Sequence, residues 1–472
     1  MPDRLATALA VVRAVADRPD PLLPVAVGAL AQELGLTTSS ASRVSAALAG
    51  VGLLDHAEGY GAYRLGRRAA TMSGRAGAAV ASAVDFALTR LSAATGETVC
   101  LVAPAPGGPR VIAVVPSGWT LHVRVRVGDL CAGPGDAAVR VLQDESCRDV
   151  ERSAADERDQ IAVGVRDQGG EVVAALVVHV PAIRTERVLP VAGRVLLAAR
   201  SNLEAAIVRA PAQHAPSDGR AVRVAAGRAS LSLAAAVLED VCEGGSEVPE
   251  IARRLGVRPE RVERVLGDAE NAGLVRLAGG GGTVTPRWYL HGWHRAVTAA
   301  VLTQQVAPLV TAAAQESRTT AYVTVRRGIR SVTVAEAFAE GPLSTQSWLG
   351  RPAQMVGADG GALLIMDLDD DQIVAVLPAR TSLTAQRTPR DLDSFLQQVR
   401  RARLDDRLVL DGYAEDGLTS VAAPVRDASG AVVAAACLVG PTHLIGRELT
   451  STRAVADRLA RGVSDLLAAP TG

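Results

Sequence analysis

The chain contains no lysine, only 3% aromatic residues and no net charge, since 50 arginines balance 50 acidic residues. Balanced charge excludes a protein-wide field that attracts nucleic acid, so any such surface has to be local. With few aromatic residues, the 48% hydrophobic content consists mainly of Ala, Val and Leu, which must build the cores. Arginine supplies forked hydrogen-bond donors wherever an anion has to be held.

Cysteine is also sparse, and the five thiols form neither a CxxC pair nor a metal-ligand spacing; they are Cys100, Cys131, Cys147, Cys242 and Cys437. An odd number of scattered thiols is typical of a reducing compartment. No uncharged apolar stretch reaches the roughly 18–20 residues that span a bilayer. The apolar N-terminal run is broken by Arg13 and Asp17, unlike a signal peptide. We expect a soluble, cytoplasmic protein with no membrane partner.

The sequence contains two related copies of one unit. "ALAQELGL" (29–36) resembles "EIARRLGV" (250–257), and Leu34 and Leu255 lie 221 positions apart. "TGETVCLV" (95–102) resembles "SRTTAYVTV" (317–325), at a separation near 222. "VRDQGGEVVAALVV" (165–178) resembles "VRDASGAVVAAACLV" (425–439), at a separation of 260. The first copy therefore lacks about 38 residues that the second keeps, roughly Asp371 to Asp406.

Each copy predicts a helical head followed by an α+β sensor domain. In the first copy we expect helices over 26–34 and 38–50, a hairpin at "GYGAYRL", a long helix over 69–94 and a final helix over 188–208. Strands are expected at "PRVIAVVP", "LHVRVRVG" and "GEVVAALVVHV". In the second copy the long and final helices are expected over 295–317 and 450–467.

These patterns divide the chain into five parts. We expect the first head at 1–68, its linker helix and truncated sensor domain at 69–208, and a Pro/Ala/Ser-rich linker at 209–224. A divergent second head at 225–292 and a complete sensor domain at 293–470 follow.

The first head predicts a helix–turn–helix, because a short helix, a glycine turn and a second helix follow within about 20 residues. In that motif the second helix lies in the DNA major groove. Thr37 or Thr38 can cap this helix, and the hydroxyls and the cation of its first turns can reach phosphates and base edges. The candidate DNA-binding residues are Thr38, Ser39, Ser40, Ser42, Arg43, Tyr63 and Arg64, with Tyr60 also on the hairpin. A plain surface helix with ordinary Ser/Thr caps is the alternative.

Beyond the general pattern, several stretches have a specific match: "LAQELGLTTSSASRVSAAL", "GLL", "YRLG", "TGETVCLV" and "VRDQGGEVVAALVV" in the first copy, and "LDGY", "AAPVRDASGAVVAA" and "GP" in the second. Together they resemble the IclR family of bacterial transcription regulators, in which a winged helix–turn–helix precedes a GAF-like effector-binding domain. The resemblance covers nearly the whole chain apart from the linker, and it implies a DNA operator and a small-molecule effector, either an organic or an aromatic acid.

The two heads differ where contact with DNA is expected. The positions of Ser39 and Ser40 are occupied by Glu260 and Arg261 in the second copy, and Glu263 lies nearby. Carboxylates repel phosphate, although Arg258, Arg261 and Arg264 can compensate. A solvated helix surface with Glu partners is the other interpretation of these arginines. The first head also departs from the family, which usually has a basic residue where Thr38 stands.

The resemblance carries effector contacts over to Ser420, Cys437 and Val439 in the second copy, and to Gln160, Val177 and His179 in the first. Family members that hold carboxylates have hydroxyls on this strand, so Cys437 and Val439 argue against a small polar acid. Because the first copy lacks the counterpart of "LDGYAEDG" (410–417), we expect the effector in the second copy. The alternative is that both domains are dimerisation scaffolds without ligands.

No arrangement of residues predicts an enzyme, a metal or a cofactor. "HGWH" (291–294) offers two histidines without a third ligand, "DLDDD" (367–371) is typical of a solvated turn, and "GGGG" (279–282) lacks the Lys-Ser/Thr of a phosphate loop. We therefore expect a transcription regulator of two fused units that pair within one chain, with a further homodimer left open. The competing hypothesis is a ligand-sensing or scaffolding protein whose heads no longer bind DNA.

Overall fold

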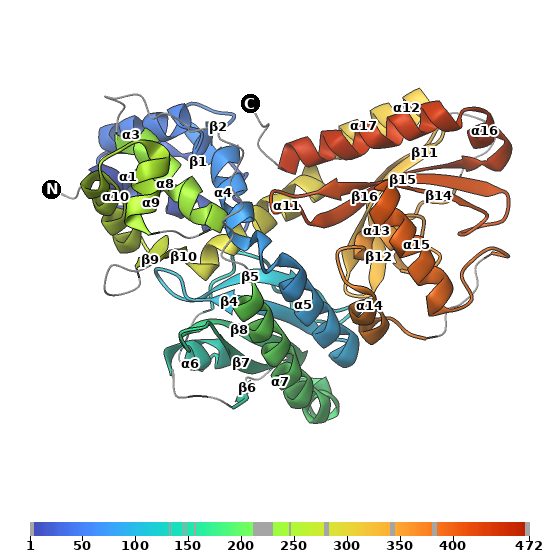
Figure 1. Ribbon diagram of the computed structural model, residues 1–472, viewed down its shortest axis with the longest axis horizontal. Coiled ribbons are helices and arrows are strands. Elements are labelled where there is room, and N and C mark those ends of the chain that lie inside the picture. The colour runs from blue at the N-terminus through green and yellow to red at the C-terminus, as the bar shows by residue number, and fades with distance from the viewer. Residues whose placement is uncertain are drawn as a thin grey trace. The chain divides into compact units, whose positions relative to one another are not determined.

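The computed structural model describes residues 4–131, 133, 135–144, 147, 149–154, 157–210, 230–244, 247–277, 283–339, 345–379 and 385–467. The predicted linker beyond Ala210, the glycine run 279–282 and the predicted end of the last domain at 468–470 lie outside these residues. The chain divides into two compact units (Figure 1). The first unit contains residues 1–84, 98–114 and 123–297, and the second contains 85–97, 115–122 and 298–472.

The first unit begins with a three-helix segment and a hairpin, residues 4–66, which we call the first head. Helix α3 has the predicted bounds, because the Thr37 hydroxyl accepts a hydrogen bond from the Ser40 amide at 3.2 Å and so caps its first turn. Strand β1 pairs with β3, which gives the sheet order β1-β3-β2. The elements are α1 (Arg4–Ala16), β1 (Val25–Ala26), α2 (Val27–Glu33), α3 (Thr38–Gly50), β2 (Leu54–His56) and β3 (Ala62–Leu65).

A second segment, residues 230–287, also has three helices followed by a two-stranded hairpin, and we call it the second head. Its third helix starts at Pro259, a residue suited to the first helical turn, and its N-cap residue Arg258 makes no side-chain capping bond. The elements are α8 (Ser230–Gly244), α9 (Val248–Leu255), α10 (Pro259–Asn271), β9 (Val275–Leu277) and β10 (Val284–Pro286).

The two heads pack against each other. Helix α1 contacts α3 of its own head and both α8 and α10 of the second head. Arg13 on α1 donates to the Ala272 carbonyl at 3.0 Å. Helix α4 (Arg67–Ala78) contacts α8, where Arg68 holds Glu239 through two hydrogen bonds of 2.6 Å. The contact therefore combines apolar helix packing with a bidentate ion pair.

The single long helices predicted after each hairpin are wrong, since both segments break in two. The first forms α4 and α5 (Ala81–Thr95), and the break follows two glycines, Gly74 and Gly77, which weaken a helix. The second forms α11 (Trp293–Gln304) and α12 (Ala307–Ser317), preceded by the short helix η2 (Trp288–Gly292). Pro308 in the first turn of α12 has no N–H to continue the preceding helix.

The sheet of the first unit has the order β5-β4-β8-β7-β6. Its elements are β4 (Thr98–Ala103), β5 (Arg110–Val115), α6 (Ala137–Gln143), β6 (Glu151–Ala154), β7 (Arg158–Arg166), β8 (Val172–Pro181), the short helix η1 (Ala182–Arg184) and α7 (Thr185–Arg209). Both α6 and α7 pack on β7 and β8. The strand predicted at "LHVRVRVG" is wrong, because backbone pairing with β5 begins only at Gly128, whose amide donates to the Val111 carbonyl.

The sheet of the second unit has the order β13-β12-β11-β16-β15-β14. Its strands are β11 (Thr320–Arg327), β12 (Arg330–Ala337), β13 (Pro352–Gln354), β14 (Leu408–Asp411), β15 (Leu418–Arg426) and β16 (Val432–Pro441). Its helices are α13 (Gly361–Ile365), α14 (Asp370–Val376), α15 (Leu392–Asp405), α16 (Thr442–Arg447) and α17 (Leu449–Leu467). An apolar core joins α13, α14 and α15 to the sheet, whereas α17 packs on β15, β16 and α12.

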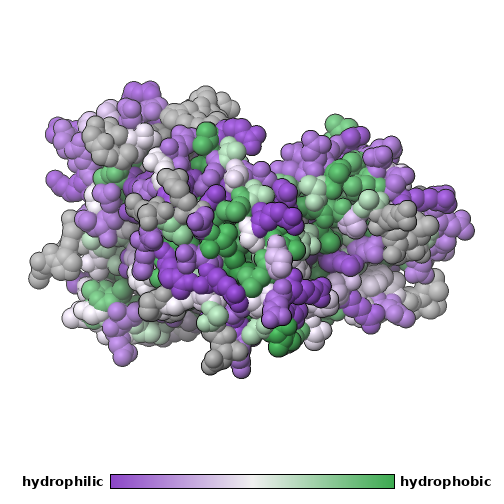
Figure 2. Space-filling model, turned by 90° about the horizontal axis from the view of Figure 1, so that it is seen from below, coloured by the Kyte–Doolittle hydropathy of each residue, from purple (hydrophilic) through white to green (hydrophobic). Residues whose placement is uncertain are grey.

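No single helix of the described chain is long and apolar enough to cross a membrane; one bent pair, Trp288–Gln304 with Ala307–Ser317, passes by length and composition alone. Hydrophilic residues cover most of the face shown in Figure 2, with hydrophobic residues exposed there in patches.

Two buried histidines next to α4 make stability depend on pH. Burial, and then the charge of Arg295, lowers the pKa of His291 to about 3 and holds the pKa of His294 well below its usual range. Below pH ~6.5 the histidine is protonated in the unfolded chain but stays neutral in the folded one. The free energy of unfolding therefore falls as the pH drops from ~6.5 towards about 3.

In His291→Gln the slope of the unfolding free energy against pH should decrease by up to about 1.4 kcal/mol per pH unit, as measured by urea unfolding between pH 7 and ~4. The exposed His443, changed to Gln, is the control; equal slopes in H291Q and H443Q would contradict the assignment.

The Arg68–Glu239 pair predicts measurable coupling between the heads. Both side chains are less than one-third exposed, so a double-mutant cycle of Arg68→Ala and Glu239→Ala should give about 1 kcal/mol. The Arg401–Asp405 pair is a matched control, because both its side chains are more than half exposed, and its coupling should be near zero. Chemical denaturation measures both cycles, and equal coupling in the two would refute a special role for the contact between the heads.

Candidate nucleic-acid interface and small-molecule cavity

The first turns of α3 present small polar groups to solvent. Thr38, Ser39 and Ser42 are exposed, and Ser40 is partly exposed. Arg43 is exposed too; its Nε lies 3.4 Å from the Ser39 carbonyl, and it pairs with no carboxylate among the described residues. Free backbone N–H groups, hydroxyls and an unpaired guanidinium at a helix start can together donate to phosphate oxygens and base edges.

The hairpin after α3 places its two tyrosines differently. Tyr63 is 4% exposed, its ring centroid lies 5.0 Å from that of His56, and it pairs with Val25 across the sheet. Tyr63 is therefore buried where an exposed side chain was expected, whereas Tyr60, between β2 and β3, is fully exposed. The spacing carried this information, because Tyr63 shares a strand face with the apolar Leu65. Arg64, on the other face, is partly exposed.

The start of α10 carries charges of both signs. Arg258, Arg261 and Arg264 are exposed, and none of them forms an ion pair with another residue in the described ranges. Glu260 and Glu263 are exposed on the same two turns. The two heads therefore share a helical frame and differ in surface chemistry.

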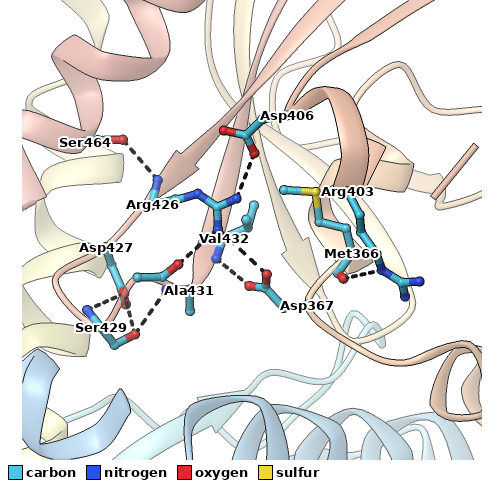
Figure 3. Close-up of polar contacts among 11 residues, drawn as sticks. Met366, Asp367, Arg403, Asp406, Arg426, Asp427, Ser429, Ala431, Val432 and Ser464 are labelled. Carbon is cyan, nitrogen blue, oxygen red and sulfur yellow. Dashed lines mark hydrogen bonds and ion pairs between the residues drawn. The ribbon is translucent and has the colours of Figure 1, made fainter. Parts of the chain in front are cut away.

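The "VRDASG" stretch forms the turn between β15 and β16 (Figure 3). The Asp427 carboxylate accepts from the Ser429 amide at 2.8 Å, and Gly430 has a φ of 84°, which favours glycine. Arg426 donates to the Gly430 carbonyl at 3.1 Å and to Asp406 at 2.8 Å, while its own amide donates to Ser464 of α17 at 3.0 Å. This stretch therefore fixes a turn and ties α17 to the sheet.

The corresponding turn of the first unit repeats two of these contacts and adds two to Arg276. Arg166 donates to the Gly170 carbonyl at 2.7 Å, and Gly169 donates its amide to the Asp167 carboxylate at 2.9 Å. The other Asp167 oxygen accepts from Arg276 of β9 at 2.6 Å, and Arg276 also pairs with Glu171. The turn thus holds the hairpin of the second head.

The second unit contains a cavity of about 410 Å³ beside β11, β12 and the segment before α13. This volume is typical of sites for small molecules. Its lining combines aromatic rings, hydroxyls and a few charges: Tyr322, Trp348, Thr324, Ser331, Thr333, Thr419, Arg351, Asp359 and Glu415, with Val439 at the strand β16.

Asp359 lies where α13 begins, and Gly360 lets that segment approach the sheet. A Cβ at Gly360 would come within 2.7 Å of the Ala435 Cβ, so only glycine fits there. Burial raises the pKa of Asp359, and a hydrogen bond that the Tyr322 hydroxyl donates to its carboxylate works in the opposite direction. The Tyr322 ring lies 5.3 Å from the ring of Trp348.

Of the three effector contacts expected in the second copy, Val439 lines the cavity. Ser420 and Cys437 are buried, at 2% and 0% exposure, and are not among its lining residues. Tyr322, Trp348 and Asp359 were not identified as site residues from the sequence. The adjacent glycines in "GADGG" (357–361) were the available signal, because close backbone approach requires them.

In the first unit two of the three equivalent positions, Gln160 and His179, carry polar side chains that contact neighbouring polar groups. The Gln160 amide donates to Asp136 at 3.2 Å, and the Sγ of Cys100 lies 3.3 Å from Nε2 of His179. Burial lowers the pKa of His179 to about 4. Ala137, Ala138 and Val141 of α6 pack with Val177 and close this region.

The remaining polar motifs have structural roles. Within the described residues, no group of three or more His, Cys, Asp or Glu side chains could hold a metal ion. "DLDDD" forms the predicted exposed turn between α13 and α14. Its carboxylates also bind: Asp367 accepts from the Val432 amide, Asp369 caps α14, and Asp370 pairs with Arg400 and Arg403. His291 and His294 are buried, in keeping with the expected packing role, and His294 contacts Ser73 at 2.9 Å.

Comparison with known proteins gives matches among solved structures. An IclR transcriptional regulator from Alicyclobacillus acidocaldarius is 22% identical, with 50% of this chain and 98% of that chain covered and a TM-score of 0.34. An IclR-type regulator from a Silicibacter species is 14% identical over 52% and 98%, with a TM-score of 0.42. An IclR homologue from Microbacterium hydrocarbonoxydans in complex with 4-hydroxybenzoate is 20% identical over 51% and 99%, with a TM-score of 0.33. No curated protein matches.

One family model matches part of the chain. It is described as the C-terminal domain of the bacterial transcriptional regulator IclR, and it matches residues 294–465. These residues include α12, the β13-β12-β11-β16-β15-β14 sheet and the cavity beside it. Residues 294–465 are therefore similar to the C-terminal domain of IclR.

Proposed function

We propose that the protein is a DNA-binding transcription regulator of the IclR type whose second unit senses a small molecule. The observation that carries the proposal is the start of α3, where exposed hydroxyls surround a helix N-terminus together with Arg43, which has no carboxylate partner in the part of the chain that the structure describes. The family match over residues 294–465 adds an effector domain to this candidate DNA-reading helix.

In this proposal α2, the turn at Gly35 to Thr37, and α3 form a helix–turn–helix, and the β2–β3 hairpin is its wing. The hydroxyls of Ser39, Ser40 and Ser42 and the guanidinium of Arg43 contact phosphates and base edges in the major groove. Thr37 already caps α3, so the hydroxyls beyond it are available for these contacts.

We further propose that the chain is a tandem duplication whose two copies pair as an intramolecular pseudo-dimer, with the domain limits given by the repeat. Reciprocal contacts support this proposal. Arg68 of α4, which follows the first hairpin, holds Glu239 on the first helix of the second head. Trp293, which follows the second hairpin, donates at 3.1 Å to Asp17, next to the first helix of the first head. The two contacts involve different residue pairs but join corresponding elements of the two copies, as expected for two-fold pairing.

The heads should not contribute equally to DNA binding. The start of α10 carries Glu260 and Glu263 among its arginines, and carboxylates so placed repel phosphates. Arg276 also ties the second hairpin to Asp167 and Glu171. We therefore propose that the first head dominates and that the operator is asymmetric.

The dominance of the first head in DNA binding is tested by fluorescence anisotropy with labelled DNA from upstream of the protein's own gene, in 50 and 200 mM salt. Arg43→Ala should reduce specific affinity by at least tenfold, the ~1.4 kcal/mol expected for a lost base contact. Arg264→Ala, at an exposed arginine of the second head, is the matched control and should change affinity less than threefold.

The competing function is a sensing or scaffolding protein with heads that no longer bind DNA, and the zero net charge favours it. No binding by the wild-type chain at 50 mM salt would establish that alternative, because even non-specific phosphate contact is measurable there. Equal losses in R43A and R264A would instead refute the dominance of the first head.

A further inference from the structure

The charges around the cavity of the second unit do not suit a simple acid. Two of its lining side chains, Asp359 and Glu415, are carboxylates, and Arg351 is its one cationic lining residue within the described chain. Arg351 and Glu415 are exposed at the rim, whereas Asp359 lies deeper. The interior of the cavity thus presents a negative group.

Asp359 has no cationic partner among the described residues. The groups that stabilise its charge are the neutral hydroxyls of Tyr322, which donates to it, and of Ser420, and no arginine contributes to its electrostatic surroundings. An ionised carboxylate removed from water is costly unless a positive or hydrogen-bonding group compensates it. Neutral hydroxyls compensate this charge only in part, and a cationic ligand that enters the cavity can supply the positive group.

The neighbouring rings suit a cation as well. Tyr322 and Trp348 both line the cavity, and their centroids lie 5.3 Å apart with the rings tilted by 56°. The faces of aromatic rings attract ammonium groups, most strongly where water is excluded. Carboxylate and rings therefore meet at one end of the cavity.

We propose that this cavity binds a small amine, with its ammonium group held between Asp359 and the Tyr322–Trp348 pair and its apolar body along the remaining wall. This inference rests on the proposed function in one respect: it takes this cavity to be the effector site of the regulator. It replaces the organic or aromatic acid expected from the family resemblance by a ligand of opposite charge.

The first unit provides an internal control, because it keeps the aspartate and lacks the rings. The position of Tyr322 is Cys100 there and that of Trp348 is Arg126, by the separation of 222. Asp136, at the start of α6, already accepts from Gln160 at 3.2 Å. The amine site is thus confined to the second unit.

The test uses the full chain and three probes of nearly equal size: 2-phenylethylamine, 2-phenylethanol and phenylacetate. Isothermal titration calorimetry should show the amine binding at least tenfold more tightly than the other two. Asp359→Asn should reduce amine affinity at least tenfold and leave 2-phenylethanol within threefold. Asp136→Asn is the matched control and should change neither, and a circular dichroism spectrum verifies that each variant is folded.

Tightest binding of phenylacetate, lost in Arg351→Ala, would overturn the proposal in favour of an acid held at the rim. Binding of none of the probes, or amine binding unchanged in D359N, would overturn it as well. The anisotropy assay, run without any probe, reports separately on the proposed function, because D359N lies far in sequence from α3 and should bind DNA like the wild type.

Discussion

Helix α1 packs the two heads into one body. Its apolar side chains, among them Leu5, Leu9 and Val12, are buried, and the helix contacts α3 of its own head together with α8 and α10 of the second. The burial of three or four such side chains contributes several kcal/mol, so neither head completes its core alone. Arg13 and Arg68 add polar contacts across the same boundary. The heads consequently form one body whose two candidate reading helices, α3 and α10, belong to a single chain.

The same local chemistry serves different purposes in the two halves. The turns at Arg166 and at Arg426 use the same arginine-to-glycine-carbonyl bond and the same aspartate cap. In the first half the spare oxygen of Asp167 holds Arg276 of the second head. The aspartates beside the two sheets differ in a similar manner. Asp136 accepts a hydrogen bond from Gln160, whereas Asp359 lines a cavity. Equivalent aspartates thus have a protein partner in one sheet and line open space beside the other.

The sequence predicted helix α3 to the residue, because Thr37 and Gly50 limit an uninterrupted apolar pattern. The prediction of one continuous helix failed at the breaks between α4 and α5 and between α11 and α12. In alanine-rich segments the hydrophobic periodicity is weak, so it does not mark where one helix ends and the next begins. The sequence placed Val439 in the cavity but not Asp359, because the raised pKa and the exposure of that carboxylate depend on contacts between distant strands. The prediction of an exposed Tyr63 is wrong, although Leu65 on the same strand face is apolar and buried. Helix caps and turns could be predicted from the sequence, whereas the burial of side chains, which depends on tertiary packing, could not.

The central claim is that one chain supplies both heads of a DNA-binding unit. Native mass spectrometry of the complex with a duplex containing a single footprinted operator tests it most directly, because the mass counts chains per DNA. The account predicts one chain on one duplex, with a chain mass of 48.7 kDa. A complex that contains two chains per operator at every protein concentration would contradict it.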